Sequence, residues 1–282
     1  KLIGEDIYSI MSNRNTGKIA MVCQSLKFSE IEQIFQRHKN VVFGVKSFTR
    51  DFSLLYRKVG NKIFPEVTQI IDKFHIIKNL MEAHQDIRVK YRQKELDKRR
   101  KAHKEFKDCE RHRLQECERS GEKYKARKFH YKEDRYENGE TTLELLARSR
   151  YLLFKFESQW KDKQEKRAKI LFRLFPEIEK SYKLSCQFRD FMSKKNIGKH
   201  FLQIDKQLNQ WYENVENAQI DEMLNFKTLI ETNEEQILNY FIEGETNAMA
   251  EAINSKIQKF ISSNQGTRDR DFFFFRLDKY FT

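Results

Sequence analysis

Proline and glycine are scarce in this chain: two of its 282 residues are proline and nine are glycine. Proline breaks a helix from within and glycine weakens one, so their scarcity permits long uninterrupted helices. Apolar residues recur at helical spacing through most of residues 76–243. We predict that this stretch is helical, with a loop at Asn138-Gly139.

The first 75 residues follow a different pattern. Two apolar, β-prone runs at 7–11 and 19–24 flank a turn at 13–17, which predicts a hairpin. The elements expected next are a helix at 29–37, a strand at 41–48, a helix from Phe52 and a strand at 67–71. This order predicts a mixed sheet, so the fold class is α/β, helix-rich and α+β by content.

The charge of the chain favours a polyanionic partner. The net charge is +13, and residues 88–135 hold 19 Lys and Arg against 10 Asp and Glu. We call this stretch the basic arm and expect it to bind nucleic acid, mainly through Lys98, Arg99, Arg100 and Lys101. No apolar run is long enough to span a membrane. The four cysteines form no CxxC pair, which argues against a structural zinc site.

Two carboxylates suggest a metal site. Asp51 follows a predicted strand, and Glu251 shares a polar helix face with Asn247 and Asn254. Carboxylates at the end of a strand and on a packed helix can converge on Mg²⁺ or Mn²⁺. Such ions support phosphodiester chemistry. Taken alone, an Asp at a strand end is more often a turn or cap residue.

Several stretches resemble, in order and over essentially the whole chain, insertion-sequence transposases of the ISL-three group. They are Asp51-Phe52-Ser53 with Phe64-Pro65; Asp72-Lys73-Phe74-His75; residues 145–153; Thr246-Asn247-Ala248 with Ala250-Glu251; Asn254-Ser255-Lys256-Ile257; Gly266-Thr267-Arg268; and residues 272–277.

The resemblance implies a ribonuclease-H-like mixed sheet interrupted by a large all-helical insertion. The core would comprise residues 1–76 and 245–282, and the insertion 77–244 would carry the basic arm. In such DDE-type enzymes three acidic residues bind the metal ions. The resemblance makes Asp51 the second and Glu251 the third, and Asp72 and His75 match a DxxH motif beside the site.

The first acidic residue is open between two alternatives. Gly4-Glu5-Asp6 offers Asp6, whereas Tyr8-Ser9-Ile10 fits the second strand of the family better. The second alignment, which we favour, puts the first acid upstream of Lys1. The chain as given would then be unable to cut or join DNA by itself.

The leading interpretation is a transposase that hydrolyses and joins DNA at insertion-sequence ends with Mg²⁺ or Mn²⁺. Its partners would be double-stranded DNA, as terminal inverted repeats and target, and a second copy of the chain in a homodimer. Its expected location is the bacterial cytoplasm, at the nucleoid. The alternatives are a non-catalytic helical protein that binds nucleic acid through the basic arm, and a helical scaffold with a charged surface.

Overall fold

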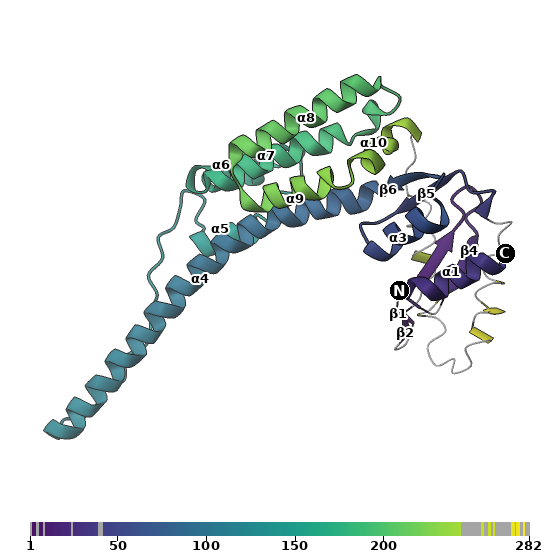
Figure 1. Ribbon diagram of the computed structural model, residues 1–282. Helices are drawn as coiled ribbons and strands as arrows, with labels where there is room; N and C mark the ends of the chain where they lie inside the picture. Colours follow the sequence, from purple (N-terminus) through teal and green to yellow (C-terminus); the bar gives the residue numbers. More distant parts are fainter. Residues whose placement is uncertain are drawn as a thin grey trace. The chain divides into compact units, whose positions relative to one another are not determined.

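The computed structural model describes residues 2–3, 6–7, 9–23, 25–38, 42–243, 255–256, 259–260, 262, 272–273, 275–276 and 279. Asn247, Glu251 and Asn254 lie outside these residues, as does the side chain of Asp6. The chain divides into two compact units (Figure 1). The first takes in Lys1–Lys78, Phe191–Gln207 and Leu229–Thr282, and the second Asn79–Asp190 and Leu208–Thr228.

The strands of the first unit form three pairs. In the described residues β1 (Leu2–Ile3) pairs antiparallel with β2 (Asp6–Ile7), β3 (Ser9–Ser12) antiparallel with β4 (Ile19–Cys23), and β5 (Ser47–Arg50) parallel with β6 (Thr68–Ile71). The predicted hairpin at 7–24 is confirmed as β3 and β4. The described strands form two-stranded sheets and not one mixed sheet, so the ribonuclease-H-like arrangement stays a prediction.

The strand predicted at 41–48 is wrong for most of its length. The strand begins only at Ser47, and residues 43 and 44 form a turn. The Val45 amide donates to the carbonyl of Val42, and both valines pack against the core. The apolar run therefore reflects burial of a turn, which the sequence pattern does not distinguish from burial of a strand.

Two helices cover the strands of the first unit. They are α1 (Phe28–Arg37) and α3 (Leu54–Ile63). The rings of Phe35 and Phe48 both lie against Phe64, with centroids 5.3 and 5.2 Å away. A further helix, α10 (Glu234–Glu243), is tied to β6, because the Asn239 side chain donates to the Gln69 carbonyl at 3.0 Å.

The remaining described helices lie almost entirely within residues 76–243, where helix was predicted, and they range from seven to 48 residues in length. They are α4 (Lys73–Ser120), α5 (Thr142–Arg148), α6 (Asp162–Leu174), α7 (Pro176–Phe191), α8 (Phe201–Ala218) and α9 (Asp221–Glu231), with short 3₁₀ turns at Glu157–Gln159 and Lys194–Asn196. In the second unit Trp211 is buried against Phe188 and Phe226. No described helix is both long and apolar enough to cross a membrane.

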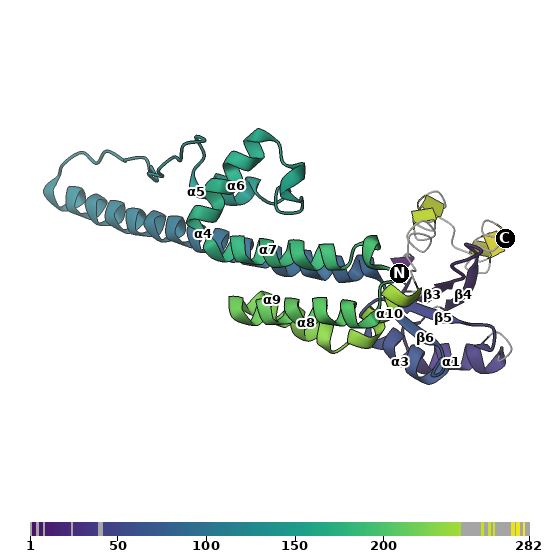
Figure 2. The same ribbon diagram turned by 90° about the horizontal axis from the view of Figure 1, so that it is seen from above.

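The all-helical prediction is wrong over residues 121–140, which contain no helix. After Ser120 the chain turns back along α4 in an extended conformation (Figure 2). We call residues 121–137 the return segment. Aromatic contacts hold it, because the Phe129 ring lies 4.7 Å from that of His103 and 5.4 Å from that of Phe106.

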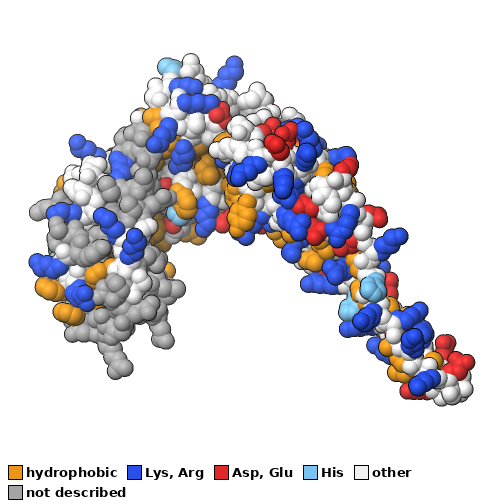
Figure 3. Space-filling model, turned by 180° about the vertical axis from the view of Figure 1, so that it is seen from behind, with side chains coloured by type: hydrophobic (Ala, Val, Ile, Leu, Met, Phe, Trp, Pro, Cys, Tyr) orange, Lys and Arg blue, Asp and Glu red, His pale blue; other side chains and the backbone are white. Residues whose placement is uncertain are grey.

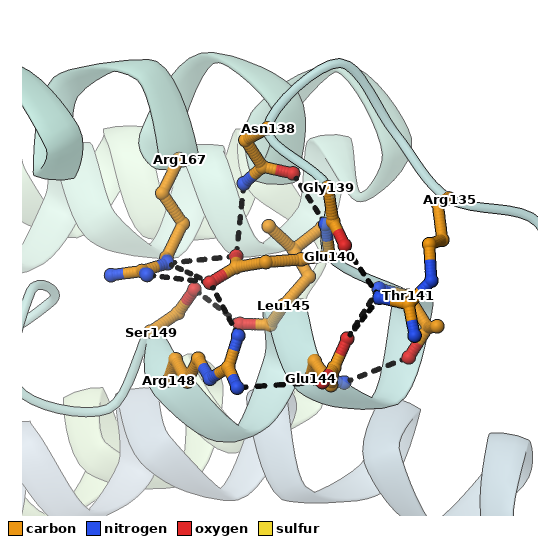
Figure 4. A network of polar contacts seen from close by, with 10 residues as sticks. All are labelled: Arg135, Asn138, Gly139, Glu140, Thr141, Glu144, Leu145, Arg148, Ser149 and Arg167. Atoms are coloured by element: carbon orange, nitrogen blue, oxygen red, sulfur yellow. Dashed lines mark hydrogen bonds and ion pairs between the residues drawn. The ribbon is translucent and has the colours of Figure 1, made fainter.

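A buried carboxylate anchors the base of the return segment (Figure 4). Glu140 is 4% exposed. Its carboxylate accepts hydrogen bonds from the guanidinium groups of Arg167 and Arg148 and from the side-chain Nδ2 of Asn138. Directly after it, Thr141 and Glu144 form a reciprocal capping box that begins α5. The chain is therefore fixed where the extended segment gives way to helix.

Candidate active site

The parallel pairing of β5 and β6 brings two carboxylates to one edge. Arg50 is paired with Ile71 in the register, so Asp51 and Asp72 follow the two strands at the same end. The Asp72 amide extends the ladder by donating to the Arg50 carbonyl at 2.8 Å. Neighbouring strands lie about 4.8 Å apart. The two residues are therefore neighbours in space. The sequence alone indicated only that each of them follows a strand.

Asp51 has one carboxylate oxygen open. Its Oδ1 accepts a hydrogen bond from the Ser53 amide at 2.8 Å, in a turn that leads into α3. Its Oδ2 accepts no hydrogen bond from the described part of the chain, and the residue is half-buried. The carboxylate is thus oriented by the backbone while one oxygen can still bind a cation.

Asp72 accepts a hydrogen bond at one oxygen and faces a histidine with the other. It is 4% exposed, and its Oδ1 accepts from the Phe74 amide at 3.1 Å in the first turn of α4. Its Oδ2 lies 3.7 Å from His75 Nε2. The DxxH motif therefore forms a local contact in which Asp72 caps α4 and faces His75. This arrangement accounts for the motif without a metal ion.

A buried cation beside Asp51 was not singled out from the sequence. Arg50 is 4% exposed, and its Nη1 donates to the Asp51 carbonyl at 3.0 Å. Its Nε is buried and has no hydrogen-bond partner among the described residues. Burial, followed by the charge of Arg57, lowers the pKa of Arg50. The signal in the sequence is that residues 46–50, which lead into Asp51, are polar or charged except for Phe48.

The described residues fit a divalent cation in part. Mg²⁺ prefers several carboxylate oxygens, and Asp51 offers one that is open. No group of three or more His, Cys, Asp or Glu residues that could hold a metal ion occurs in the described part of the chain. Further ligands would have to come from residues outside it, such as Glu251.

Helix α10 brings the chain toward this edge. Lys73, which follows Asp72, donates to the Tyr240 hydroxyl at 3.3 Å, and Asn239 is bonded to β6. Helix α10 ends at Glu243, eight residues before Glu251. Eight residues span at most about 28 Å. The position of α10 is therefore compatible with Glu251 reaching Asp51.

Comparison with known proteins identifies the family. The model of a transposase family, DDE_Tnp_ISL3, matches residues 4–277. The chain belongs to the ISL3 transposase family. No curated protein and no solved structure matches it. The family predicted from the ordered motifs is thereby confirmed, and DNA is the general substrate of a transposase.

In this ISL3 transposase the predicted DNA-binding residues do not share a face. Successive residues of a helix are rotated by about 100°, so Lys98, Arg99, Arg100 and Lys101 point in four directions. Lys98 pairs with Glu95 at 2.6 Å, and Arg100 with Asp97 at 3.1 Å. The Arg99 guanidinium lies over the ring of Tyr131 in the return segment, 5.9 Å from its centroid. That these four residues bind DNA stays a prediction.

Proposed function

We propose that this chain carries at least the Asp51–Glu251 part of the catalytic centre of an ISL3 transposase that hydrolyses phosphodiester bonds and joins strands at insertion-sequence ends. In this proposal Asp51 and Glu251 hold a divalent cation, Mg²⁺ or Mn²⁺. Asp6 remains a candidate for the first acid, beside the alternative of a residue upstream of Lys1. The formation of a homodimer and a location at the bacterial nucleoid stay predictions.

The open Oδ2 of Asp51, at the carboxyl edge of two parallel strands, is the observation that carries the proposal. Its neighbour Asp72 has an equally placed backbone, but it is buried, with one oxygen bonded to the Phe74 amide and the other facing His75 at 3.7 Å. Two adjacent carboxylates therefore have different roles: Asp51 is available to a ligand, and Asp72 begins a helix. The proximity of α10 supports Glu251 as the partner of Asp51.

The chain's own residues orient the reacting groups. The Ser53 amide fixes the Asp51 carboxylate, so the open oxygen keeps one direction. When bound, a divalent cation supplies stabilisation of negative charge on the phosphate and activation of the attacking oxygen. Buried Arg50 fixes the adjoining backbone through the Asp51 carbonyl. A preorganised carboxylate does not need to reorient during the reaction, which lowers the barrier.

Strand cleavage and strand transfer test this proposal. The substrate is a duplex ending in the terminal repeats of the element, with Mg²⁺ or Mn²⁺ present. Because the oxygen of an asparagine side chain can still accept from the Ser53 amide, Asp51→Asn should keep the fold and lower the rate by roughly 10²-fold or more. Glu251→Gln should do the same, whereas Asp72→Asn, which keeps the helix cap, should lose far less.

The same assay separates the alternative function. A non-catalytic nucleic-acid-binding protein would bind the duplex with or without divalent cations and would cut it in neither condition. In that alternative the exposed basic residues of the arm would bind the nucleic acid. Cleavage that is unchanged in Asp51→Asn would contradict the proposed site, and an upstream extension of an inactive chain would test the first acid.

A further inference from the structure

The return segment covers one face of α4 within the second unit. Its contacts fall on a row of residues spaced alternately by four and three, which is one side of a helix. The row is Arg99, His103, Phe106, Glu110, Arg113 and Cys117. The return segment therefore occupies this side of α4, although Arg99 and His103 stay partly accessible.

Glu110 locks the two segments together. Its side chain accepts hydrogen bonds from the Arg127 amide at 3.1 Å, the Arg127 guanidinium at 2.7 Å and the Tyr124 hydroxyl at 2.9 Å. It also accepts from Arg113 on α4 at 2.7 Å. Desolvation opposes ionisation, yet these bonds together lower the pKa of Glu110 to about 2. The arm is thus preorganised before any ligand arrives.

A basic row lies beside the covered face. One position further round α4, by about 100°, four successive exposed residues are cationic: Arg100, Lys104, Lys107 and Arg111. The row then continues with Leu114 and Glu118, so the cationic part spans residues 100–111. We call the four cationic residues the basic stripe. The flank on the other side of the covered face is mixed in charge, because it carries the acidic Glu105 beside Lys98 and Lys101. The arm therefore has a cationic side and a mixed side.

The charges of the stripe are accessible. Arg100 and Arg111 pair with Asp97 and Asp108 at 3.1 Å, but all four side chains are substantially exposed. Exposed ion pairs contribute little and exchange readily for other anions. Lys104 and Lys107 have no ion pair among the described residues. Blue Lys and Arg side chains follow the arm in Figure 3.

The return segment extends the cationic surface. Phe129 and Tyr131 contact residues of α4, while Lys128, His130 and Lys132 alternate with them and are exposed. In an extended chain alternate side chains point to opposite sides. The outward side of residues 128–132 is therefore basic.

We propose that the arm binds double-stranded DNA through the basic stripe and the outward lysines of the return segment, and that it contacts phosphates without reading bases. The choice of DNA rests on the proposed function, together with the charge complementarity. A lone helix, about 10–12 Å across, fits the major groove, which is about 12 Å wide. The stripe and the outward lysines lie on two sides of α4 and its return segment, which together are wider than one helix, so in this proposal both sets reach backbone phosphates rather than base edges inside one groove.

The test compares two variants of the full chain that lose equal charge. One replaces Lys104, Lys107 and Arg111 by Gln, and the control replaces Lys94, Lys98 and Lys101 of the other flank. Binding to a duplex of arbitrary sequence is followed by fluorescence anisotropy over a range of salt concentrations, with EDTA present. The stripe variant should lose roughly tenfold or more in affinity, and its salt slope should flatten by about three. The control should change by less than one in slope.

Several results would overturn the proposal. Equal losses in both variants would mean that net charge, and not one face, governs binding. No loss in either would remove the arm from the interface. Strong dependence on base sequence would contradict phosphate contact, and a stripe-dependent affinity for duplex RNA alone would contradict DNA as the partner. Because EDTA removes divalent cations, these results are independent of whether Asp51 is catalytic.

Discussion

The strand-edge site and the basic arm use charged residues in opposite ways. At the edge of β5 and β6, Asp72 and Arg50 are buried and bonded to the backbone, and one oxygen of Asp51 stays open. On the arm, the basic stripe is exposed and its ion pairs are superficial. Buried charge fixes geometry at the site, whereas exposed charge on the arm provides affinity for a polyanion.

The largest effect on stability is expected where a carboxylate is buried, at the base of the return segment. Glu140→Ala leaves Arg167, which is itself 21% exposed at its side chain, without its main partner. Allowing for that exposure, we expect the free energy of unfolding, measured by urea denaturation, to fall by about 2–3 kcal/mol.

The pH dependence of Glu140 follows from the same contacts. The hydrogen bond from Arg167, against the opposing effect of burial and with help from Arg148, lowers the pKa of Glu140 below its ordinary 4.5. Its contribution is therefore complete above that value and is lost as the pH falls through the lowered pKa. Glu144→Gln, at a side chain that is 35% exposed, serves as the control and should cost far less stability, because glutamine can also complete a capping box. Equal losses of stability in Glu140→Ala and Glu144→Gln would contradict the claim that the buried carboxylate contributes more than the partly exposed one.

The elements that sequence predicted well are those fixed by neighbouring residues. The β3–β4 hairpin follows from its turn residues, and Asp51 follows a strand directly. The return segment could not be predicted in this way, because its path depends on Phe129 meeting His103 and Phe106 across a turn of the chain. Alternating aromatic and basic residues at 128–132 were the available signal. The adjacency of Asp51 and Asp72 likewise depended on strand pairing.

A smaller effect should separate the two carboxylates at the strand edge. Asp72→Ala removes the cap of α4 and should lower stability by about 1 kcal/mol. Asp51→Asn keeps an acceptor for the Ser53 amide, so its melting temperature should be nearly unchanged. Thermal unfolding followed by circular dichroism measures both. A larger loss in Asp51→Asn than in Asp72→Ala would make Asp51 a structural residue.

The smallest effect is expected on the arm, and it is local. Glu110→Gln weakens the charged hydrogen bonds to the return segment, so trypsin should cut faster at Lys125, Arg127 and Lys128 while overall unfolding changes little. Glu105→Gln, exposed on the same helix, is the control. Because the pKa of Glu110 is lowered to about 2, its contribution is present above its ordinary 4.5 and fades toward pH 2. Equal cleavage in the two variants would mean that Glu110 does not hold the segment.

The central claim, that Asp51 and Glu251 hold one cation, is tested most directly by Mn²⁺ binding in a double-mutant cycle. Binding is measured by electron paramagnetic resonance for the unaltered chain, Asp51→Asn, Glu251→Gln and the double variant. Residues that share a ligand are non-additive, so either single change should remove most of the binding and the double variant should lose little more. Independent losses that add in the double variant, or Mn²⁺ binding unaffected by both changes, would contradict a shared site.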